Sequence, residues 1–558
     1  MTRANPGSPL LLGPLLRHVG ETDATVWVQT ADTARVTVRC GGGSWSADTF
    51  AVHGFHYALV VVEGLEPGTV HPYTVEVGDT AVWPPAESAF PPSRIATLRR
   101  SKPARLAFGS CRTSSPHDQQ GNRMHGVDAL RAYAVRMAED DEDGWPDLCV
   151  FLGDQVYADR QICPQMLDFI RSRRDTSQPP GEEIKDYVEY DYLYRLAWTD
   201  PAVRWILSTV PSTMIFDDHD VRDDWNTSWS WRREIRQKPW WQTRIVAALA
   251  SYWVYQHLGN LGPKSLAEDE IWTQVLAHEG GPELDLTDVL DAFAARADEH
   301  PETYRWSFTR DLGESQLVVV DSRAARKLDP KHRSMLDDDE MAWFDARLRG
   351  DCQYLFIGTS LPFLLPPGLH HFEALDEAIA QGAWGQRPAR AAERVRRALD
   401  LEHWAAFNDS FVDVFESVMA VARGQRGTAP KVITFLSGDV HNSYLAEVSD
   451  PGRYGATSRI VQAVCSPMRN PMPRSVRVLM SLFAKGLAKP MRAIAGGSSK
   501  VPDPAYPWTV TEGPWFDNNL AVCQVEGDGL SFRWYAGEVV DGDLERPRTK
   551  VVADITIG

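Results

Sequence analysis

The sequence predicts an α/β protein in which a small antiparallel β-sandwich precedes a larger domain of buried strands and helices. Two observations support this prediction. Apolar and polar residues alternate through much of residues 24–79, which is typical of strands with one buried face. Farther along the chain, short apolar runs end in polar residues and are separated by segments of helical character, as in sheets whose strands lie between helices.

The first domain is expected to cover residues 1–100. The segments ATVWVQTADTARVTVRC and FHYALVVVEGLEPGTVHPYTVEVGD alternate around short turns, and about four to seven short strands suffice for a small immunoglobulin- or fibronectin-like sandwich. The proline-rich stretch WPPAESAFPPS follows them and is typical of a linker. The second domain is therefore expected to cover residues 101–558.

Buried strands in the second domain are each expected to end in a polar loop. The apolar runs with their loops are RLAFGSC, DLCVFLGD, STMIFDDHD, QLVVVDSR, QYLFIGTS and KVITFLSGDVH. Ligands of α/β proteins bind in the crevice at the carboxyl ends of the strands, so we expect these loops to face one crevice. Helices are predicted at 125–140, 187–207, 239–258, 336–349, 374–399 and 402–424, and closing strands after about residue 505.

The net charge limits the ligands that the protein can attract. The chain of 558 residues carries a formal charge of −18 and has a sequence pI of about 5.3. Such a field repels polyanions, so we expect no nucleic-acid-binding module. An anionic substrate would meet the same repulsion, and its binding would require a local cationic patch or a bound metal ion.

Cysteine usage and hydropathy indicate a cytoplasmic protein. The seven cysteines are scattered without a CxxC pair, so a disulfide scaffold is not expected. The sequence has no run of 18 apolar residues, which excludes a transmembrane segment. The N-terminal residues lack the basic and long apolar regions of a secretory signal, although export of a processed form stays open.

The segment FDDHDVRDD concentrates aspartates around His219. Negative charge at this density disfavours the ionised carboxylates unless cations bind. Because the segment follows the apolar strand STMIF, a bound metal explains it better than a solvated run of charges. The aspartates are Asp217, Asp218, Asp220, Asp223 and Asp224.

Three further loops offer side chains that bind metals. Asp154 follows the apolar run VFLG, and Tyr157 comes three residues later, close enough in a tight loop to reach the same cation. Asp439 and His441 follow KVITFL on the same side of an extended segment and offer an oxygen and a nitrogen ligand. Cys111 ends the run FGSC, where a thiol serves as a ligand, a nucleophile or a small buried apolar group.

These motifs, in this order, resemble the alkaline phosphatase D (PhoD) family of the calcineurin-like metallophosphoesterases. Its members carry an N-terminal β-sandwich and a catalytic domain with SC, GDxxY, DDHE and GDVH signatures, and this chain has FGSC, GDQVY, DDHD and GDVH. The resemblance implies a metallophosphoesterase-like α/β domain whose β-sandwich core is flanked by helices. It also implies a metal-dependent phosphomonoesterase or phosphodiesterase.

Carried over residue by residue, the resemblance implies a set of metal ligands and one catalytic histidine. His219 becomes the phosphate-binding or proton-donating residue. Asp218 contacts or bridges to a second ion. The chain departs from the family where Asp220 replaces the usual Glu, and where Asp223 and Asp224 replace the frequent Asn-Asn, so Asp224 is the candidate oxygen ligand from this loop. The remaining implied ligands are Cys111, Asp154, Tyr157, Asp439 and His441.

The resemblance further implies Fe³⁺ and Ca²⁺ as the metals, with other divalent ions left open. The expected substrate is a small-molecule or polymeric phosphate ester. Arginines near the motifs can hold its non-bridging oxygens through paired N–H groups, and Arg323 is preferred because it follows the strand that ends in Asp321. The other candidates are Arg112, Arg222 and Arg469.

Two other functions stay open. A calcium-stabilised carbohydrate- or polymer-binding protein without turnover would account for the many tryptophans, but it leaves His219 and Cys111 unexplained. A related metallohydrolase that acts on another kind of ester would keep the metals and differ only in substrate.

Three segments have two interpretations each. The tryptophan-rich residues 223–241 form a pocket wall, or they stack beneath a long loop. Residues 365–386 form a lid that carries His370 and His371, or a surface loop. The basic residues 468–492 contact a membrane or an anionic partner, or they form a packed amphipathic helix.

Overall fold

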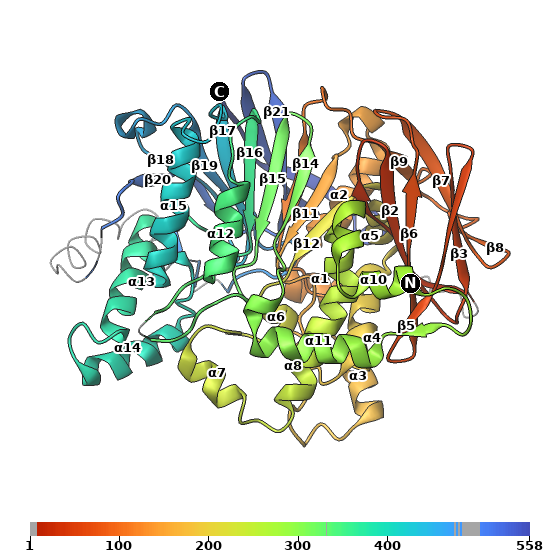
Figure 1. Ribbon diagram of the computed structural model, residues 1–558, viewed down its shortest axis with the longest axis horizontal. Coiled ribbons are helices and arrows are strands. Elements are labelled where there is room, and N and C mark those ends of the chain that lie inside the picture. Colours follow the sequence, from red (N-terminus) through yellow and green to blue (C-terminus); the bar gives the residue numbers. More distant parts are fainter. Residues whose placement is uncertain (1–7, 331, 474–475, 478–479, 482–500, 502) are drawn as a thin grey trace.

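The computed structural model describes residues 8–330, 332–473, 476–477, 480–481, 501 and 503–558. The predicted α/β class is confirmed: a β-rich N-terminal region lies beside a larger region of strands and helices (Figure 1). Within the described residues, no helix is both long enough and apolar enough to cross a membrane.

The N-terminal region is a sandwich of two sheets. Its apolar core takes residues from both sheets, such as Val26 and Val60 from one and Val38 and Val75 from the other. Strand order in the first sheet is β1 (Leu10–Val19), β2 (Asp23–Thr30), β6 (Phe55–Glu63), β5 (Phe50–Val52) and β13 (Leu284–Asp285). The second sheet holds β4 (Gly43–Asp48), β3 (Arg35–Cys40), β7 (Val70–Val77) and β8 (Thr80–Trp83), with β9 (Arg94–Ala96) paired to β7.

All pairs in these two sheets are antiparallel except one. Strand β13 comes from much later in the chain and pairs in parallel with β5. The N-terminal sandwich is therefore joined to the rest of the protein by backbone hydrogen bonds, beyond the linker that the sequence predicts. The predicted domain boundary at residue 100 stays a prediction.

The larger region is built on two mixed sheets that face each other. The first has the order β12 (Ser212–Ile215), β11 (Leu148–Leu152), β10 (Arg105–Gly109), β21 (Asn519–Glu526), β22 (Gly529–Glu538) and β23 (Arg548–Ile557). The second has the order β14 (Phe308–Leu312), β15 (Ser315–Val320), β16 (Tyr354–Thr359), β17 (Val432–Ser437), β19 (Arg459–Val464), β18 (Ser443–Val448) and β20 (Trp508–Trp515). The predicted apolar runs form β10, β11 and β12 in one sheet and β15, β16 and β17 in the other.

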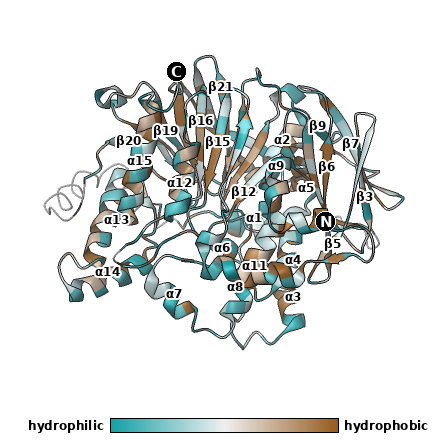
Figure 2. Ribbon diagram, viewed as in Figure 1, coloured by the Kyte–Doolittle hydropathy of each residue, from teal (hydrophilic) through white to brown (hydrophobic). Residues whose placement is uncertain are grey.

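Side-chain alternation along β15 shows how the layers pack. Leu317 and Val319 join the core between the two sheets, whereas Val318 and Val320 belong to a second core that includes Phe344 of α12 (Asp338–Arg347). Successive side chains of a strand point to opposite faces, so β15 is buried on both sides. Figure 2 accordingly shows apolar residues concentrated on central strands such as β16 and β19.

Several predicted helices are confirmed, although some are divided. The prediction at 187–207 covers two helices, because Asp200 caps a new helix that begins with Pro201. The prediction at 374–399 is interrupted by Gly382 and Gly385, whose φ angles are positive. The corresponding helices are α2 (Ala129–Glu139), α4 (Tyr187–Trp198), α5 (Pro201–Thr209), α8 (Trp241–Tyr252), α12, α13 (Pro367–Ala380), α14 (Gln386–Ala398) and α15 (Asn408–Ala422).

Shorter helices complete this region. They are α1 (Gln119–His125), α3 (Pro164–Arg173), α6 (Asp218–Val221), α7 (Trp229–Ile235), α9 (Pro263–Glu268), α10 (Trp272–Ala277) and α11 (Thr287–Glu299). A π-helical turn, Trp253–His257, and a 3₁₀ turn, Leu258–Asn260, extend α8.

The surface-loop interpretation of residues 365–386 is wrong, whereas the lid interpretation stays a prediction. Most of this segment is helix α13, and His370 is buried with its ring centroid 4.8 Å from those of Phe411 and Trp508. Leu365 and Leu369 belong to the same apolar core as Phe411 of α15 and Trp508 of β20, which accounts for this burial. Much of the basic segment 468–492, for which a membrane contact or a packed amphipathic helix is predicted, lies outside the described residues.

Candidate metal centre

The loops after β10, β11, β12 and β17 meet at the carboxyl ends of their strands, as expected. Figure 1 shows α6, which follows β12, just below the sheets. Here sets of three side chains have ligand atoms within 4.8 Å of one another. The sets are Cys111, Asp154 and His441; Asp154, Asp218 and His219; Asp217, Asp218 and Asp439; and Asp159, His219 and Asp223.

The backbone at the predicted ligands is strained. Cys111, Asp154, Asp439 and His441 all have φ between 50° and 62°. Side chains larger than glycine adopt this left-handed region rarely, and such residues concentrate at functional sites. The strain directs these side chains toward one another at the ends of three different strands.

Sulfur, oxygen and nitrogen atoms meet in the first set. The Tyr157 hydroxyl lies 3.2 Å from Asp154 Oδ2 and accepts a hydrogen bond of 2.8 Å from Asn470 Nδ2. Burial and the carboxylate of Asp154 raise the pKa of the Cys111 thiol, whereas burial lowers the pKa of His441 to about 4. The imidazole is therefore neutral and ready to bind a metal, while a thiolate here would need a cation beside it.

The set of Asp217, Asp218 and Asp439 places three carboxylates beside one arginine. The Arg323 guanidinium is fully buried and pairs with Asp217, with Asp218 at 3.2 Å and with Glu402 at 2.6 Å. Although burial opposes the charged form, these carboxylates raise the pKa of Arg323. Because its donors face protein carboxylates, this geometry favours a positioning role for Arg323, and direct phosphate binding stays a prediction.

The carboxylates at this site outnumber the positively charged side chains that the protein places beside them. Burial and the neighbouring Asp218 and Asp217 raise the pKa of Asp154 well above its usual range. Among the described residues, Asp154 Oδ1 and Asp217 Oδ2 are buried without a hydrogen-bond donor. Buried carboxylate oxygens without donors are costly, so this donor set fits bound metal ions.

Asp220 organises the loops around these ligands. Its Oδ2 accepts hydrogen bonds of 2.9 Å from the backbone N–H groups of Asp154 and Asp217, and its Oδ1 accepts one from Val156 at 3.3 Å. Asp220, which stands where the family usually has Glu, therefore ties the loop after β11 to the loop after β12.

His219 is held at the edge of the cluster by a carboxylate. Its Nδ1 lies 2.9 Å from Asp159 Oδ1, and its Nε2 lies 3.6 Å from Asp223 Oδ1. The side chain is 13% exposed, so one side of the ring meets solvent. A carboxylate at Nδ1 fixes the orientation of the imidazole and leaves Nε2 to meet a ligand.

The sequence pattern of the PhoD-like phosphatases matches residues 111–487. The chain belongs to the PhoD-like phosphatase family. Residues 7–95 match a domain of unknown function, DUF7800, and no curated protein matches the chain. The family resemblance inferred from the four motifs is thereby confirmed, and the protein is a phosphatase-type, metal-dependent phosphoesterase.

Two solved structures share the fold. A structure of PhoD has a TM-score of 0.58 at 13% identity, covering 100% of this chain and 91% of its own. The purple acid phosphatase PPD1 from yellow lupin (Lupinus luteus) seeds has a TM-score of 0.50 at 11% identity, covering 99% of this chain and 75% of its own.

The structure adds residues to this PhoD-like centre that sequence reasoning missed. His403 lies with Nδ1 2.7 Å from Glu373 Oε1 and Nε2 3.4 Å from Asp439 Oδ2. Neither residue follows a buried strand, so the pattern of strand and polar loop could not find them. Asp159 and Asn470 did carry that signal, since they stand in FLGDQVYAD and in the loop after β19.

Asp224 lies apart from the sets of candidate ligands. Its backbone N–H donates to Asp218 Oδ2 at 3.0 Å, and burial together with Glu402 and Asp400 raises its pKa to about 9. Metal binding by an Asp224 oxygen stays a prediction. At the rim, Arg160 is largely exposed and pairs with Asp223.

The other arginine candidates are engaged elsewhere. Arg112 forms a buried ion pair of 2.7 Å with Asp128, and Arg222 pairs with Glu183 at 3.1 Å. Arg469 donates to the backbone carbonyls of Ser115 and Pro116. These contacts give the three arginines structural partners outside the carboxylate cluster.

Most of the tryptophan-rich segment packs into the core. Trp225, Trp231 and Trp241 are buried, and the Trp225 ring centroid lies 5.2 Å from that of Phe216. Trp229 is 47% exposed. These buried rings therefore agree with the interpretation that residues 223–241 stack beneath a long loop.

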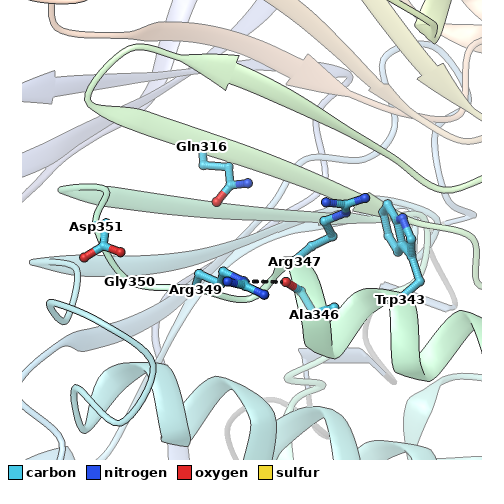
Figure 3. Close-up of a pocket in the computed structure, with 7 residues that line it drawn as sticks. All are labelled: Gln316, Trp343, Ala346, Arg347, Arg349, Gly350 and Asp351. Carbon is cyan, nitrogen blue, oxygen red and sulfur yellow. Dashed lines mark hydrogen bonds between the residues drawn. The ribbon is translucent and has the colours of Figure 1, made fainter. Parts of the chain in front are cut away.

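A surface pocket also lies at the other end of the second sheet (Figure 3). Gln316 stands at the start of β15, and Gly350 and Asp351 precede β16. The pocket is thus at the amino ends of these strands, whereas the candidate ligands follow carboxyl ends. The remaining lining residues are Trp343, Ala346, Arg347 and Arg349.

Proposed function

We propose that this enzyme hydrolyses phosphate monoesters or diesters at a centre of two metal ions. The observation that carries the proposal is a pair of ligand sets, one with Asp154 and one with Asp218, that the set of Asp154, Asp218 and His219 connects. One ion would be held by Cys111, Asp154, Tyr157 and His441, and the second by Asp217, Asp218 and Asp439, with Asp154 beside both. The ions, when bound, would polarise the phosphoryl oxygens and activate water.

The chemistry of the ligands supports different ions in the two positions. A thiol, a phenol and an imidazole suit a transition metal, whereas carboxylate oxygens alone suit a hard cation. We therefore assign Fe³⁺ to the first position and Ca²⁺ to the second. Anomalous scattering at the iron edge from a crystal would test the assignment, and a first position occupied by zinc alone would contradict it.

The protein's own groups would orient the ester and transfer a proton. Asp159 holds His219 Nδ1, and a ring nitrogen of His219 lies within 4.8 Å of ligand atoms of Asp154 and Asp218. The imidazole is thus placed to contact the phosphoryl group or protonate the leaving alkoxide. Arg323 would keep Asp217 and Asp218 in place. Exposed Arg160 would meet anionic groups of the ester at the rim.

Removal of the metals is expected to abolish activity and destabilise the fold. Without cations the buried carboxylates repel one another, and ligands at about a thousand times their Kd stabilise a protein by about 4 kcal/mol. Dialysis against a chelator should therefore lower Tm by several degrees and eliminate turnover of aryl phosphate mono- and diesters, both restored by metal. Folded, metal-free protein that retains full activity would contradict the proposal.

Two controls separate the alternative functions. Metal-loaded protein that hydrolyses carboxylic esters but no phosphate ester would indicate a related metallohydrolase. Protein that binds calcium and a carbohydrate without any turnover would indicate the binding protein. The expected cytoplasmic location stays a prediction.

His403 is expected to support metal binding through Asp439. Partners that orient a ligand typically contribute 10- to 100-fold to metal affinity, so His403→Gln should weaken metal binding by about tenfold. Metal titration monitored by mass spectrometry would measure this effect. His300→Gln, the same change at an exposed histidine, is the matched control, and equal affinities in both variants would exclude the role.

A further inference from the structure

Arg17 of the N-terminal sandwich reaches into the phosphatase region. It lies on β1, and its side chain is fully buried. Nη1 donates to the carbonyl of Tyr255 at 2.7 Å, and Nη2 donates to the carbonyl of Gln256 at 2.6 Å. Burial lowers the pKa of Arg17 to about 9, so placing the guanidinium here carries an energetic cost that these contacts must offset.

The acceptors belong to the π-helical turn that follows α8. A π-helical turn changes the regular hydrogen bonding of a helix and is frequent at functional sites. Gly259, just beyond it, is required for the contact, because a Cβ there would lie 2.4 Å from Arg17 Cζ. The turn is therefore shaped to receive a side chain from the N-terminal sandwich.

The other side of this turn contacts the loops of the metal centre. The Gln256 side chain is fully buried, and its Nε2 donates to Asp220 Oδ1 at 3.1 Å and to the Tyr194 hydroxyl at 3.0 Å. Asp220 in turn holds the backbone N–H groups of Asp154 and Asp217. A continuous chain of buried hydrogen bonds thus joins the N-terminal sandwich to two candidate ligands.

Arg17 also covers the edge of β12, the strand that leads directly to Asp217. Its Nε donates to the carbonyl of Ser212 at 3.2 Å. Asn260 satisfies both backbone groups of Met214, at 2.9 and 2.6 Å. Because β12 is the edge strand of its sheet, these contacts replace a missing neighbour.

We propose that the N-terminal sandwich is a working part of the metal centre and that Arg17 is its positioning residue. By holding the π-helical turn and the edge of β12, Arg17 places the backbones of Asp154 and Asp217 for metal binding. The inference rests on the metal centre proposed above, and it gives the N-terminal domain a role in the phosphatase rather than an independent one.

Arg17→Met in the full chain tests this role, because it removes the donors and keeps an unbranched apolar side chain. The matched control is Tyr73→Phe, which removes one hydrogen bond of 2.6 Å between the same sandwich and the carbonyl of Ser208 on α5. Metal affinity and Tm would be measured for each variant with and without metal.

Arg17→Met is expected to weaken metal binding by about tenfold, the lower end of the effects of residues that support ligands. It should also reduce the rise in Tm that metal produces. Tyr73→Phe should lower Tm but keep the wild-type affinity and the wild-type rise. Unchanged metal affinity in Arg17→Met, or an equal loss in both variants, would overturn the inference.

Gln256→Leu keeps the inference testable if Arg17→Met does not fold. It cuts the link to Asp220 while the backbone carbonyls still receive Arg17, and the same tenfold loss is expected. Wild-type metal affinity in Gln256→Leu would overturn this inference and leave the proposed function intact. Wild-type protein that binds no metal would overturn the proposed function, and the inference with it.

Discussion

Asp154→Asn is expected to reduce kcat/KM for aryl phosphates by about a thousandfold and yet to make the metal-free protein more stable. Asp154 belongs to the set with Cys111 and His441 and to the set with Asp218 and His219. Loss of several kcal/mol of metal-dependent stabilisation of the transition state corresponds to about this factor. In the metal-free protein, burial and the nearby Asp218 and Asp217 disfavour the Asp154 carboxylate. A neutral amide of the same shape relieves that repulsion.

The matched control for this variant is Asp128→Asn, a change at an equally buried aspartate with the opposite surroundings. Asp128 pairs with Arg112 at 2.7 Å, and breaking a buried pair typically costs about 3–5 kcal/mol. Asp128→Asn should therefore lower Tm while leaving metal content unchanged. Thermal unfolding with and without metal distinguishes the two variants. A fall in the Tm of metal-free Asp154→Asn would contradict the conclusion that the buried carboxylates repel one another.

His219→Gln is expected to reduce kcat for alkyl phosphates by about 10²- to 10⁴-fold, the usual contribution of a positioned acid or base. The imidazole is oriented by Asp159 at Nδ1, and a ring nitrogen lies within 4.8 Å of ligand atoms of Asp154 and Asp218. An alkoxide is a poor leaving group and needs a proton. The 4-nitrophenolate ion leaves without one, so the same variant should lose only about tenfold on 4-nitrophenyl phosphate.

The comparison between these substrates separates two roles of His219. Equal losses on both would indicate that the histidine binds the phosphoryl group, because binding does not depend on the leaving group. Metal content must be measured in parallel, since His219 also lies within 4.8 Å of ligand atoms of Asp154 and Asp218. Asp159→Asn should show the same substrate dependence with a smaller loss.

The loops that hold the candidate ligands could be predicted from the sequence for a simple physical reason. A buried strand that ends in charged residues must place them where its sheet ends, because the interior cannot accept them. This reasoning located Asp154, Asp218 and His219 after β11 and β12, and Asp439 and His441 after β17. It also located Cys111 after β10.

Other residues could not be predicted in this way because helices bring them to the site. Glu373 stands within α13, and His403 follows α14. The contact of Glu373 with His403, and of His403 with Asp439, depends on how these helices pack over the second sheet. Helical periodicity indicates a buried face but not which side chain of that face meets a ligand from another sheet.

By itself the sequence determined the fold class and the family, and it identified candidate side chains for a metal site, since each depends on local patterns of burial and charge. Only the tertiary structure decided which carboxylates lie close together, that Arg323 faces Asp217, and that Arg17 reaches the π-helical turn beside Asp220. Those relations join segments far apart in the chain. Their distances are set by the packing of two sheets and the N-terminal sandwich, which no local pattern encodes.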